Sequence, residues 1–164
     1  MQNYPSVPRL LDAILEGWTR CLLPPYGDGE FTPTDGVTDC NRFVAFVADK
    51  LGYKRLTDLR ANAIYNFLAE PTNGWTKVSS FSAGEYANRG CLVIAAWKNP
   101  VANLSGHVAI VRPGLLETSV KWKYDIPTVP KVANVGPLER CRVDRAANWA
   151  FGEEPSYFVL NSKD

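Results

Sequence analysis

The chain of 164 residues contains a single histidine, and its four cysteines are far apart in the sequence. Cys21, Cys40, Cys91 and Cys141 lack the Cys-x-x-Cys spacing of structural zinc sites, so we expect no metal site. Because there is only one imidazole, any mechanism that pairs a cysteine with a histidine must use His107.

Export and membrane signals are missing as well. The N-terminal residues 1–5 show no charged region followed by an apolar run, and no stretch of about 18 consecutive apolar residues occurs. We therefore expect neither a signal peptide nor a membrane span. The formal net charge is +1 and the basic residues are scattered, so nothing favours nucleic acid or an anionic membrane as a partner.

The composition favours one globular domain spanning residues 1–164, which we expect to be a monomer. Apolar residues make up 46% of the chain and aromatic residues 12%, enough for a sizeable core. An even cysteine count permits disulfides, but without a signal peptide buried thiols are the simpler expectation for most of them. Pairing among Cys21, Cys91 and Cys141 stays open.

Apolar periodicity predicts helices in the first half of the chain and strands in the second. The expected helices span about residues 6–22, 38–52, 57–70 and 82–88, and the expected strands about residues 75–78, 91–97, 107–112, 128–135 and 157–160. Helices followed by strands indicate an α+β fold with an antiparallel sheet.

The segment 38–52 predicts an amphipathic helix with Cys40 in its first turn. Cys40 shares an apolar face with Phe43 and Val47, so the thiol points toward the core from the positive end of the helix dipole. A thiol with a pKa of about 8.5 is only about 3% thiolate at neutral pH, and the dipole shifts a pKa by less than about one unit. A strongly activated nucleophile would therefore need an imidazole nearby.

His107 begins an expected strand, and alternation places it on one face with Ala109 and Val111. We expect the Cys40 helix to pack across that face and bring the thiol to the imidazole. Asn134, in an otherwise apolar strand, is the candidate to hold the second ring nitrogen. Each residue also has a structural interpretation: Cys40 and His107 as core residues, and Asn134 as the polar group of a turn or bulge.

Cys40 and His107 lie in motifs that resemble those of the NlpC/P60 and CHAP cell-wall cysteine peptidases. The motifs are Tyr26-Gly27-Asp28-Gly29, Pro33, Gly36 and Asp39-Cys40 before the thiol, and Gly106-His107-Val108-Ala109-Ile110-Val111 around the histidine. One departure is Asn41-Arg42, where many NlpC/P60 enzymes have Ser-Gly, and it suggests a different substrate preference.

A wider set of motifs resembles the bacterial type VI amidase effectors, which are toxins that cut peptidoglycan stem peptides in rival cells. These motifs are Cys40-Asn41-Arg42-Phe43-Val44, Ala61-Asn62-Ala63, Trp75-Thr76-Lys77-Val78, Leu92-Val93-Ile94-Ala95 and the histidine strand. The resemblance covers roughly residues 20–160 in layout, and its specific part is the cysteine and histidine motifs.

The resemblance implies a papain-like NlpC/P60 fold, with a nucleophile helix packed on a central antiparallel sheet. It assigns Cys40 as the nucleophile, His107 as the general base and acid, and Asn134 as the orienting residue, without a metal or organic cofactor. The substrate- and oxyanion-binding residues that it implies are Tyr26, Asp39 and Asn41.

We therefore expect a peptidoglycan amidase or endopeptidase that hydrolyses an amide bond of the stem peptide, as an antibacterial effector with a cognate immunity protein. We expect synthesis in the cytoplasm and delivery to the periplasm or cell wall of a target cell by a secretion system or by lysis. Three alternatives remain open: a phage-type lysin of the same chemistry, a thiol acyltransferase or deamidase on the same scaffold, and a non-catalytic binding domain with Cys40 and His107 in its core.

Overall fold

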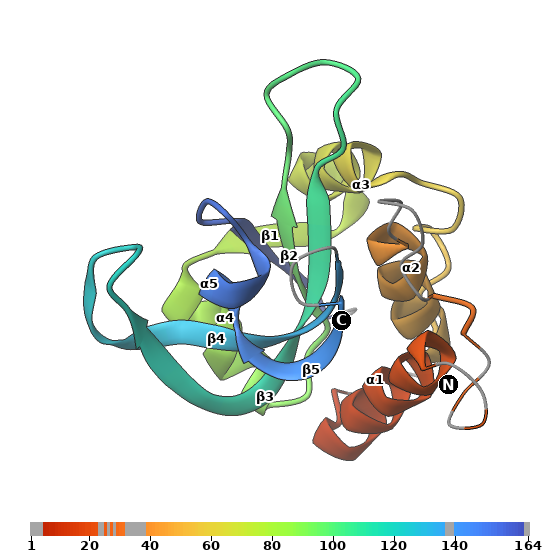
Figure 1. The fold of residues 1–164 in the computed structure, drawn as a ribbon, viewed down its shortest axis with the longest axis horizontal. Coiled ribbons are helices and arrows are strands. Elements are labelled where there is room, and N and C mark those ends of the chain that lie inside the picture. Colours follow the sequence, from red (N-terminus) through yellow and green to blue (C-terminus); the bar gives the residue numbers. More distant parts are fainter. Residues whose placement is uncertain are drawn as a thin grey trace.

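A computed structural model describes residues 5–22, 25, 27, 29–31, 39–136 and 140–162. The helices are α1 (Val7–Cys21), α2 (Cys40–Lys50), α3 (Ala61–Ala69), α4 (Ser80–Asn88) and α5 (Ala147–Ala150), with a 3-10 helix η1 (Pro71–Asn73). The strands are β1 (Trp75–Val78), β2 (Val93–Trp97), β3 (His107–Ser119), β4 (Tyr124–Gly136), β5 (Arg140–Ala146) and β6 (Ser156–Leu160). The strands form one antiparallel sheet in the order β1-β6-β2-β3-β4-β5, which confirms the α+β prediction (Figure 1).

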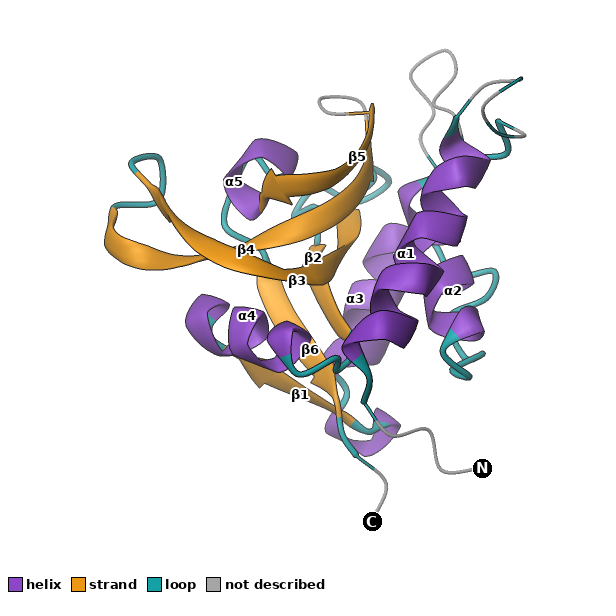
Figure 2. Ribbon diagram, turned by 90° about the horizontal axis from the view of Figure 1, so that it is seen from below, coloured by secondary structure: helices purple, strands orange, loops and turns teal. Residues whose placement is uncertain are grey.

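Helices cover both faces of this sheet. Figure 2 shows α1, α2 and α3 on one side and α4 and α5 on the other. We call the apolar cluster on the first side the α1–α3 core; it includes Leu10, Ile14, Cys40, Phe43, Val44, Val47, Ile64, Ile94, Ala96, Val108, Ile110, Ala133 and Val135. We call the cluster on the second side the α4–α5 core; it includes Ala83, Ala87, Val93, Ala95, Ala109, Val111, Val132, Ala147, Ala150 and Phe151. The alternation of strand residues between the two cores follows from the two-residue period of a β-strand.

No helix in the described part of the chain combines the length and the apolar character needed to cross a membrane.

Helix α1 packs closely against α2 because Gly17 has no side chain. A Cβ atom at Gly17 would lie 2.7 Å from Cε2 of Phe43, a ring that is buried in the α1–α3 core. Ser6 caps the start of α1, since its hydroxyl accepts a hydrogen bond from the Arg9 N–H at 3.4 Å. After the C-terminal end of α2, Gly52 takes the left-handed conformation with φ +90°, which suits a glycine that follows a helix.

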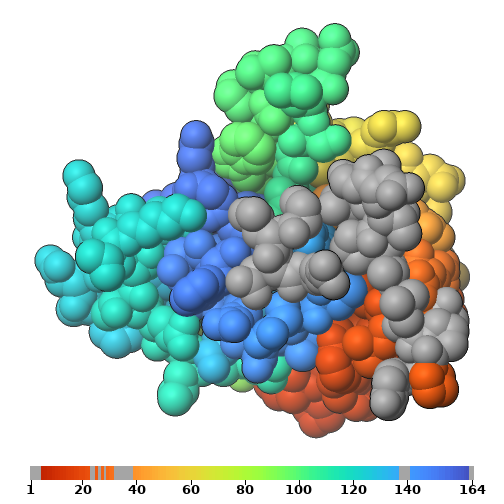
Figure 3. Space-filling view, viewed as in Figure 1, coloured from red at the N-terminus to blue at the C-terminus, as the bar shows by residue number. Residues whose placement is uncertain are grey.

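Strands β3 and β4 are longer than their apolar segments predicted and form a hairpin that projects from the molecule (Figures 1 and 3). The pairing of β3 with β4 shifts register between Arg112 and Glu117. Beside this shift, the Asn88 side chain accepts a hydrogen bond from the Gly114 N–H at 2.8 Å and donates one to the Gly114 carbonyl at 3.2 Å. Asn88, a residue of α4, thereby pairs with the backbone groups of Gly114 at the point where the strand pairing is irregular.

Some expected helix starts were wrong. We expected Thr57 to cap the third helix, but its hydroxyl donates to the Lys54 carbonyl, and α3 begins at Ala61. We expected Ser82 to begin the fourth helix. The N-cap is instead Ser79, whose hydroxyl accepts a hydrogen bond from the Ser82 N–H at 3.1 Å. In both cases a serine or threonine hydroxyl found a partner within three residues, so the residue type alone did not fix the cap position.

A disulfide joins Cys21, at the end of α1, to Cys141 in β5, with 6.0 Å between their Cα atoms. The expectation that these cysteines are buried thiols is therefore wrong for this pair. Cys40 and Cys91 keep their thiols. The bond spans 120 residues, and in the loop-entropy account a bond closing a loop of about 100 residues stabilises the folded state by about 4.7 kcal/mol.

The close approach of α1 and α2 makes Gly17 sensitive to substitution. We expect Gly17→Val to lower the free energy of unfolding by about 1–3 kcal/mol in urea denaturation, because the branched side chain overlaps the buried Phe43 ring. Gly152→Val is the matched control, since a Cβ at Gly152 meets no atom within 4 Å, and its effect should stay within about 0.5 kcal/mol. Equal effects of the two substitutions would contradict the packing described for α1 and α2.

Candidate active site

Cys40 is the first residue of α2, and its side chain is only 4% exposed. It belongs to the α1–α3 core together with Phe43, Val44 and Val47, as the spacing predicted. The first N–H groups of a helix have no partner within the helix, so this end of α2 offers donors to a developing negative charge. The sulfur of Cys40 is therefore a buried thiol at an electropositive helix end.

His107 is the first residue of β3, and it lies across from Trp97 of β2. Its Nε2 lies 2.5 Å from Oδ1 of Asn134, so the structure brings these two candidate residues together. Since an amide oxygen can only accept, Nε2 carries the proton and Nδ1 is the basic nitrogen of the ring. Among the described residues, Nδ1 has no hydrogen-bond partner, which leaves it available to take a proton.

Asn134 lies in β4 and is 2% exposed, between the apolar residues Ala133 and Val135. Alternation places Asn134 and Gly136 on one face, the face that His107 occupies in β3. A Cβ at Gly136 would lie 2.9 Å from Cε1 of His107, so a glycine is needed here for the imidazole to lie against β4. The amide of Asn134 thus has a defined role in the fold, since it is the partner of a mostly buried ring.

Phe151 covers the same imidazole, and sequence patterns did not indicate it. Its ring centroid lies 4.8 Å from that of His107, with the two planes tilted by 56°, and the residue is 2% exposed. Phe151 directly follows α5, a helix that apolar periodicity missed because it has only four residues. The ring covers part of the imidazole and makes the surroundings of the bond between His107 and Asn134 less polar.

Burial controls the protonation of His107. It lowers the pKa of the imidazole, because the charged form loses hydration, and the hydrogen bond to Asn134 partly offsets this by raising the pKa. The net shift is downward. At neutral pH the ring is therefore mainly neutral and can act as a base through Nδ1.

The expected packing of α2 on the sheet was wrong in one respect. We expected α2 to cover the face of β3 that carries His107, Ala109 and Val111. Ala109 and Val111 instead belong to the α4–α5 core, whereas Cys40 belongs to the α1–α3 core with Val108. Strand periodicity tells which residues share a face, but it leaves open which face a helix covers. The hydrogen bonds of the described residues include none between Cys40 and His107.

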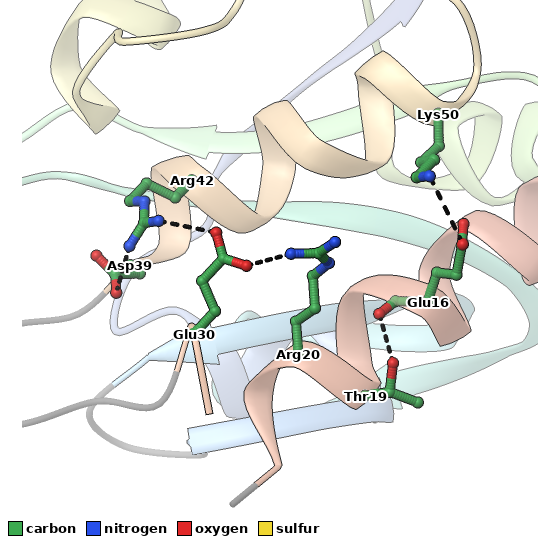
Figure 4. Close-up of polar contacts among 7 residues, drawn as sticks. All are labelled: Glu16, Thr19, Arg20, Glu30, Asp39, Arg42 and Lys50. Atoms are coloured by element: carbon green, nitrogen blue, oxygen red, sulfur yellow. Dashed lines mark hydrogen bonds and ion pairs between the residues drawn. The ribbon is translucent and has the colours of Figure 1, made fainter. Parts of the chain in front are cut away.

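The residues beside Cys40 hold the start of α2 in place. Figure 4 shows Glu30 between the guanidinium groups of Arg20 and Arg42. Arg42 also lies 3.4 Å from Oδ2 of Asp39, the residue before Cys40. These ion pairs are partly exposed, so each contributes at most about 1 kcal/mol, but together they connect α1, the Glu30 turn and α2.

The remaining predicted site residues have the following positions. Asp39 is the N-cap of α2 without a side-chain capping bond, and its carboxylate faces Arg42. Asn41 donates a hydrogen bond from Nδ2 to the Leu59 carbonyl at 3.0 Å, which ties α2 to the segment before α3. Tyr26, expected to line the oxyanion site, lies outside the described residues.

A surface hollow of about 420 Å³ lies beside the first turns of α2. Its lining includes the acidic residues Glu30 and Asp58 and the basic residues Arg42 and Arg60. Glu30 and Arg42 pair with one another across it, and Cys40, His107 and Asn134 are not among its lining residues, so the hollow lies beside the candidate site and not within it.

The described residues contain no group of three or more His, Cys, Asp or Glu side chains that could hold a metal ion. A scan against protein-family models and a comparison with curated proteins gave no match for this chain.

Two substitutions at Asn134 should shift the pKa of His107 in opposite directions. In the wild type, we expect the pKa of the imidazole below about 6.5. Asn134→Ala should lower it further, because the hydrogen bond that raises it is lost, and Asn134→Asp should raise it, because a carboxylate stabilises the imidazolium. NMR titration is direct here, since the chain has one histidine.

The same titration has a consequence for stability. A native pKa below the unfolded value means that the unfolded chain binds a proton more readily, so acidification below about pH 6.5 should destabilise the native state. An imidazole that titrates like a free histidine in all three proteins would contradict the buried arrangement.

Proposed function

We propose that the chain adopts a papain-like NlpC/P60 fold as a single domain and hydrolyses an amide bond in the stem peptide of bacterial peptidoglycan. The observation that carries this proposal is the hydrogen bond from His107 to Asn134, which orients a half-buried, mainly neutral imidazole with Nδ1 as its basic atom. An imidazole held in this way is the arrangement that activates a cysteine nucleophile. The cysteine with a suitable setting is Cys40, at the start of α2.

In the proposed reaction, Nδ1 of His107 takes the proton of the Cys40 thiol, and the thiolate attacks the carbonyl carbon of the amide. N–H groups at the start of α2, which have no partner within the helix itself, stabilise the oxyanion of the tetrahedral intermediate. The imidazolium then protonates the leaving amine, which gives a thioester. In the second half, His107 activates water to hydrolyse the thioester and regenerate the thiol.

This reaction requires the thiol and Nδ1 to meet where α2 and β3 both begin. Cys40 is the first residue of its helix and His107 the first residue of its strand, so neither lies in the middle of a sheet face. At the end of a strand, a side chain can be reached from beside the sheet as well as from the face it occupies. The approach of Cys40 to His107 is the part of the proposal that the experiments below test.

The charged hollow beside α2 supports a peptide with free charges as the substrate. Stem peptides carry carboxylates and, in many bacteria, a free amine, and the hollow offers Arg60 and Asp58 as opposite charges beside the Glu30–Arg42 ion pair. Because this substrate lies outside the cytoplasm, the proposal includes delivery by a secretion system or by lysis, with an immunity protein as the partner of an effector.

Digestion of purified peptidoglycan tests the proposal. We expect the wild type to release stem-peptide fragments with new amino groups, detected by chromatography and mass spectrometry. Cys40→Ser should lower the rate at least about 1000-fold, because the nucleophile is lost. Cys91→Ser is the matched control, since Cys91 is the other thiol, and it should stay within about twofold. Intact peptidoglycan after incubation with the wild type would refute the assignment.

Alkylation of Cys40 tests its activation directly. In the Cys91→Ser variant with the disulfide intact, Cys40 is the remaining thiol, so iodoacetamide reports on it alone. At pH 6 a thiol with a pKa of about 8.5 is only about 0.3% thiolate. If His107 activates Cys40, adding His107→Gln should slow alkylation at pH 6 by at least about tenfold. Both variants bury Cys40 equally, so equal rates would show that the imidazole does not reach the thiol.

A further inference from the structure

The edge of the sheet beside Asn134 depends on strand β5. The paired residues of β3 and β4 begin with Ile110 and Ala133, while residues 134–136 of β4 pair with residues 142–140 of β5. The β4–β5 register also shifts between Val132 and Asn134. Residues 134–136 of β4, which hold His107 in place, are therefore aligned mainly by the first three residues of β5. The register shift separates this stretch from the rest of the β4–β5 pairing.

Two contacts with α1 hold the first residues of β5 in place. Cys141 lies across from Val135 and is joined to Cys21 at the end of α1 by the disulfide. In addition, Trp18 donates from Nε1 to the Cys141 carbonyl at 3.1 Å. Among the described residues, β5 is the last strand of the sheet and has one neighbouring strand, β4. A further anchor, from Nη1 of Arg112 to the Val143 carbonyl at 2.7 Å, acts two residues later.

The loop closed by the disulfide contains the three candidate catalytic residues. Cys40, His107 and Asn134 all lie between Cys21 and Cys141, which are 120 residues apart. Cys141 faces the α1–α3 core, whereas its neighbour Arg142 lies across from Asn134 on the other face. The bond therefore holds the strand from the side opposite to the imidazole.

We propose that the Cys21–Cys141 disulfide positions Asn134, and through it His107, so that the site is assembled only in the oxidised protein. The bond forms when the thiols of Cys21 and Cys141 exchange with the disulfide of a dithiol oxidase. The two protons and two electrons pass to the sulfurs of that oxidase, which leaves as a dithiol. A reducing cytosol disfavours this bond and an oxidising periplasm favours it. The protein is thus inactive where it is made and becomes active where its substrate lies.

The activity part of this inference rests on the proposed function, but the single histidine gives an independent readout. The Nε2–H proton of His107 is held by Asn134, so its NMR signal and its rate of exchange with water report on that bond whether or not the protein is an enzyme. The experiment compares the oxidised protein with protein reduced by dithiothreitol, at a temperature where circular dichroism shows both to be folded.

Reduction should speed exchange of the Nε2–H proton at least about tenfold, because the β4 edge loosens. It should also lower kcat for peptidoglycan cleavage at least about tenfold with little change in KM, because the base is misplaced while the charged hollow remains. Cys21→Ala/Cys141→Ala should behave like the reduced wild type and be insensitive to dithiothreitol. Cys91→Ser, the matched control, should respond to reduction as the wild type does.

Three outcomes would overturn the inference. The reduced, folded protein could show unchanged exchange of the Nε2–H proton and unchanged kcat, or a thiol assay of protein purified without reductant could count four thiols. The third outcome is global unfolding on reduction. The last would show that the bond holds the whole fold rather than this edge. If the oxidised wild type cleaves no peptidoglycan, the proposed function fails. The exchange measurement then still decides whether the disulfide positions His107.

Discussion

The hydrogen bond between His107 and Asn134 is the interaction on which the candidate site depends. It exists because the start of β3 and the end of β4 lie side by side, so two residues 27 positions apart share one face. Gly136 leaves room for the imidazole and Phe151 covers it. Without the imidazole, the buried amide of Asn134 would lose its partner, and leaving a buried polar group unsatisfied costs about 1–3 kcal/mol. The pairing of β3 with β4 therefore also determines the orientation and the protonated nitrogen of the His107 ring.

The elements that bury an apolar stripe could be predicted from the sequence. Periodicity gave α1, α2 and the central strands, because their apolar residues recur at the spacing of the element that buries them. The sequence analysis did not predict strand β5, because charged residues interrupt its apolar pattern. The strand lies at the edge of the sheet, where charged side chains are common. The outer parts of β3 and β4 were missed because Pro113 and Pro127 read as turn signals within a long hairpin.

Part of the arrangement of the candidate site could be predicted from the sequence, and part of it could not. The pairing of His107 with Asn134 was predictable, since a lone asparagine in an apolar strand must find a partner. The face covered by α2 was not, because Val108 and Ala109 are both apolar and either face of β3 could have received a helix. The contact of Phe151 and the disulfide both depend on tertiary proximity, for which a single sequence has no signal.

The cysteines divide into two kinds with different physical roles. Cys21 and Cys141 are consumed in a bond between α1 and the edge strand, where a covalent link replaces the second neighbouring strand that β5 lacks. Cys40 lies in the first turn of a helix that the Glu30 ion pairs and the Phe31 ring hold against α1, so its thiol is kept in a fixed setting. A nucleophile needs such a setting, whereas the structural pair needs only proximity. With the structural pair joined, Cys40 and Cys91 are the cysteines that keep a thiol, and of these two Cys40 is the buried one.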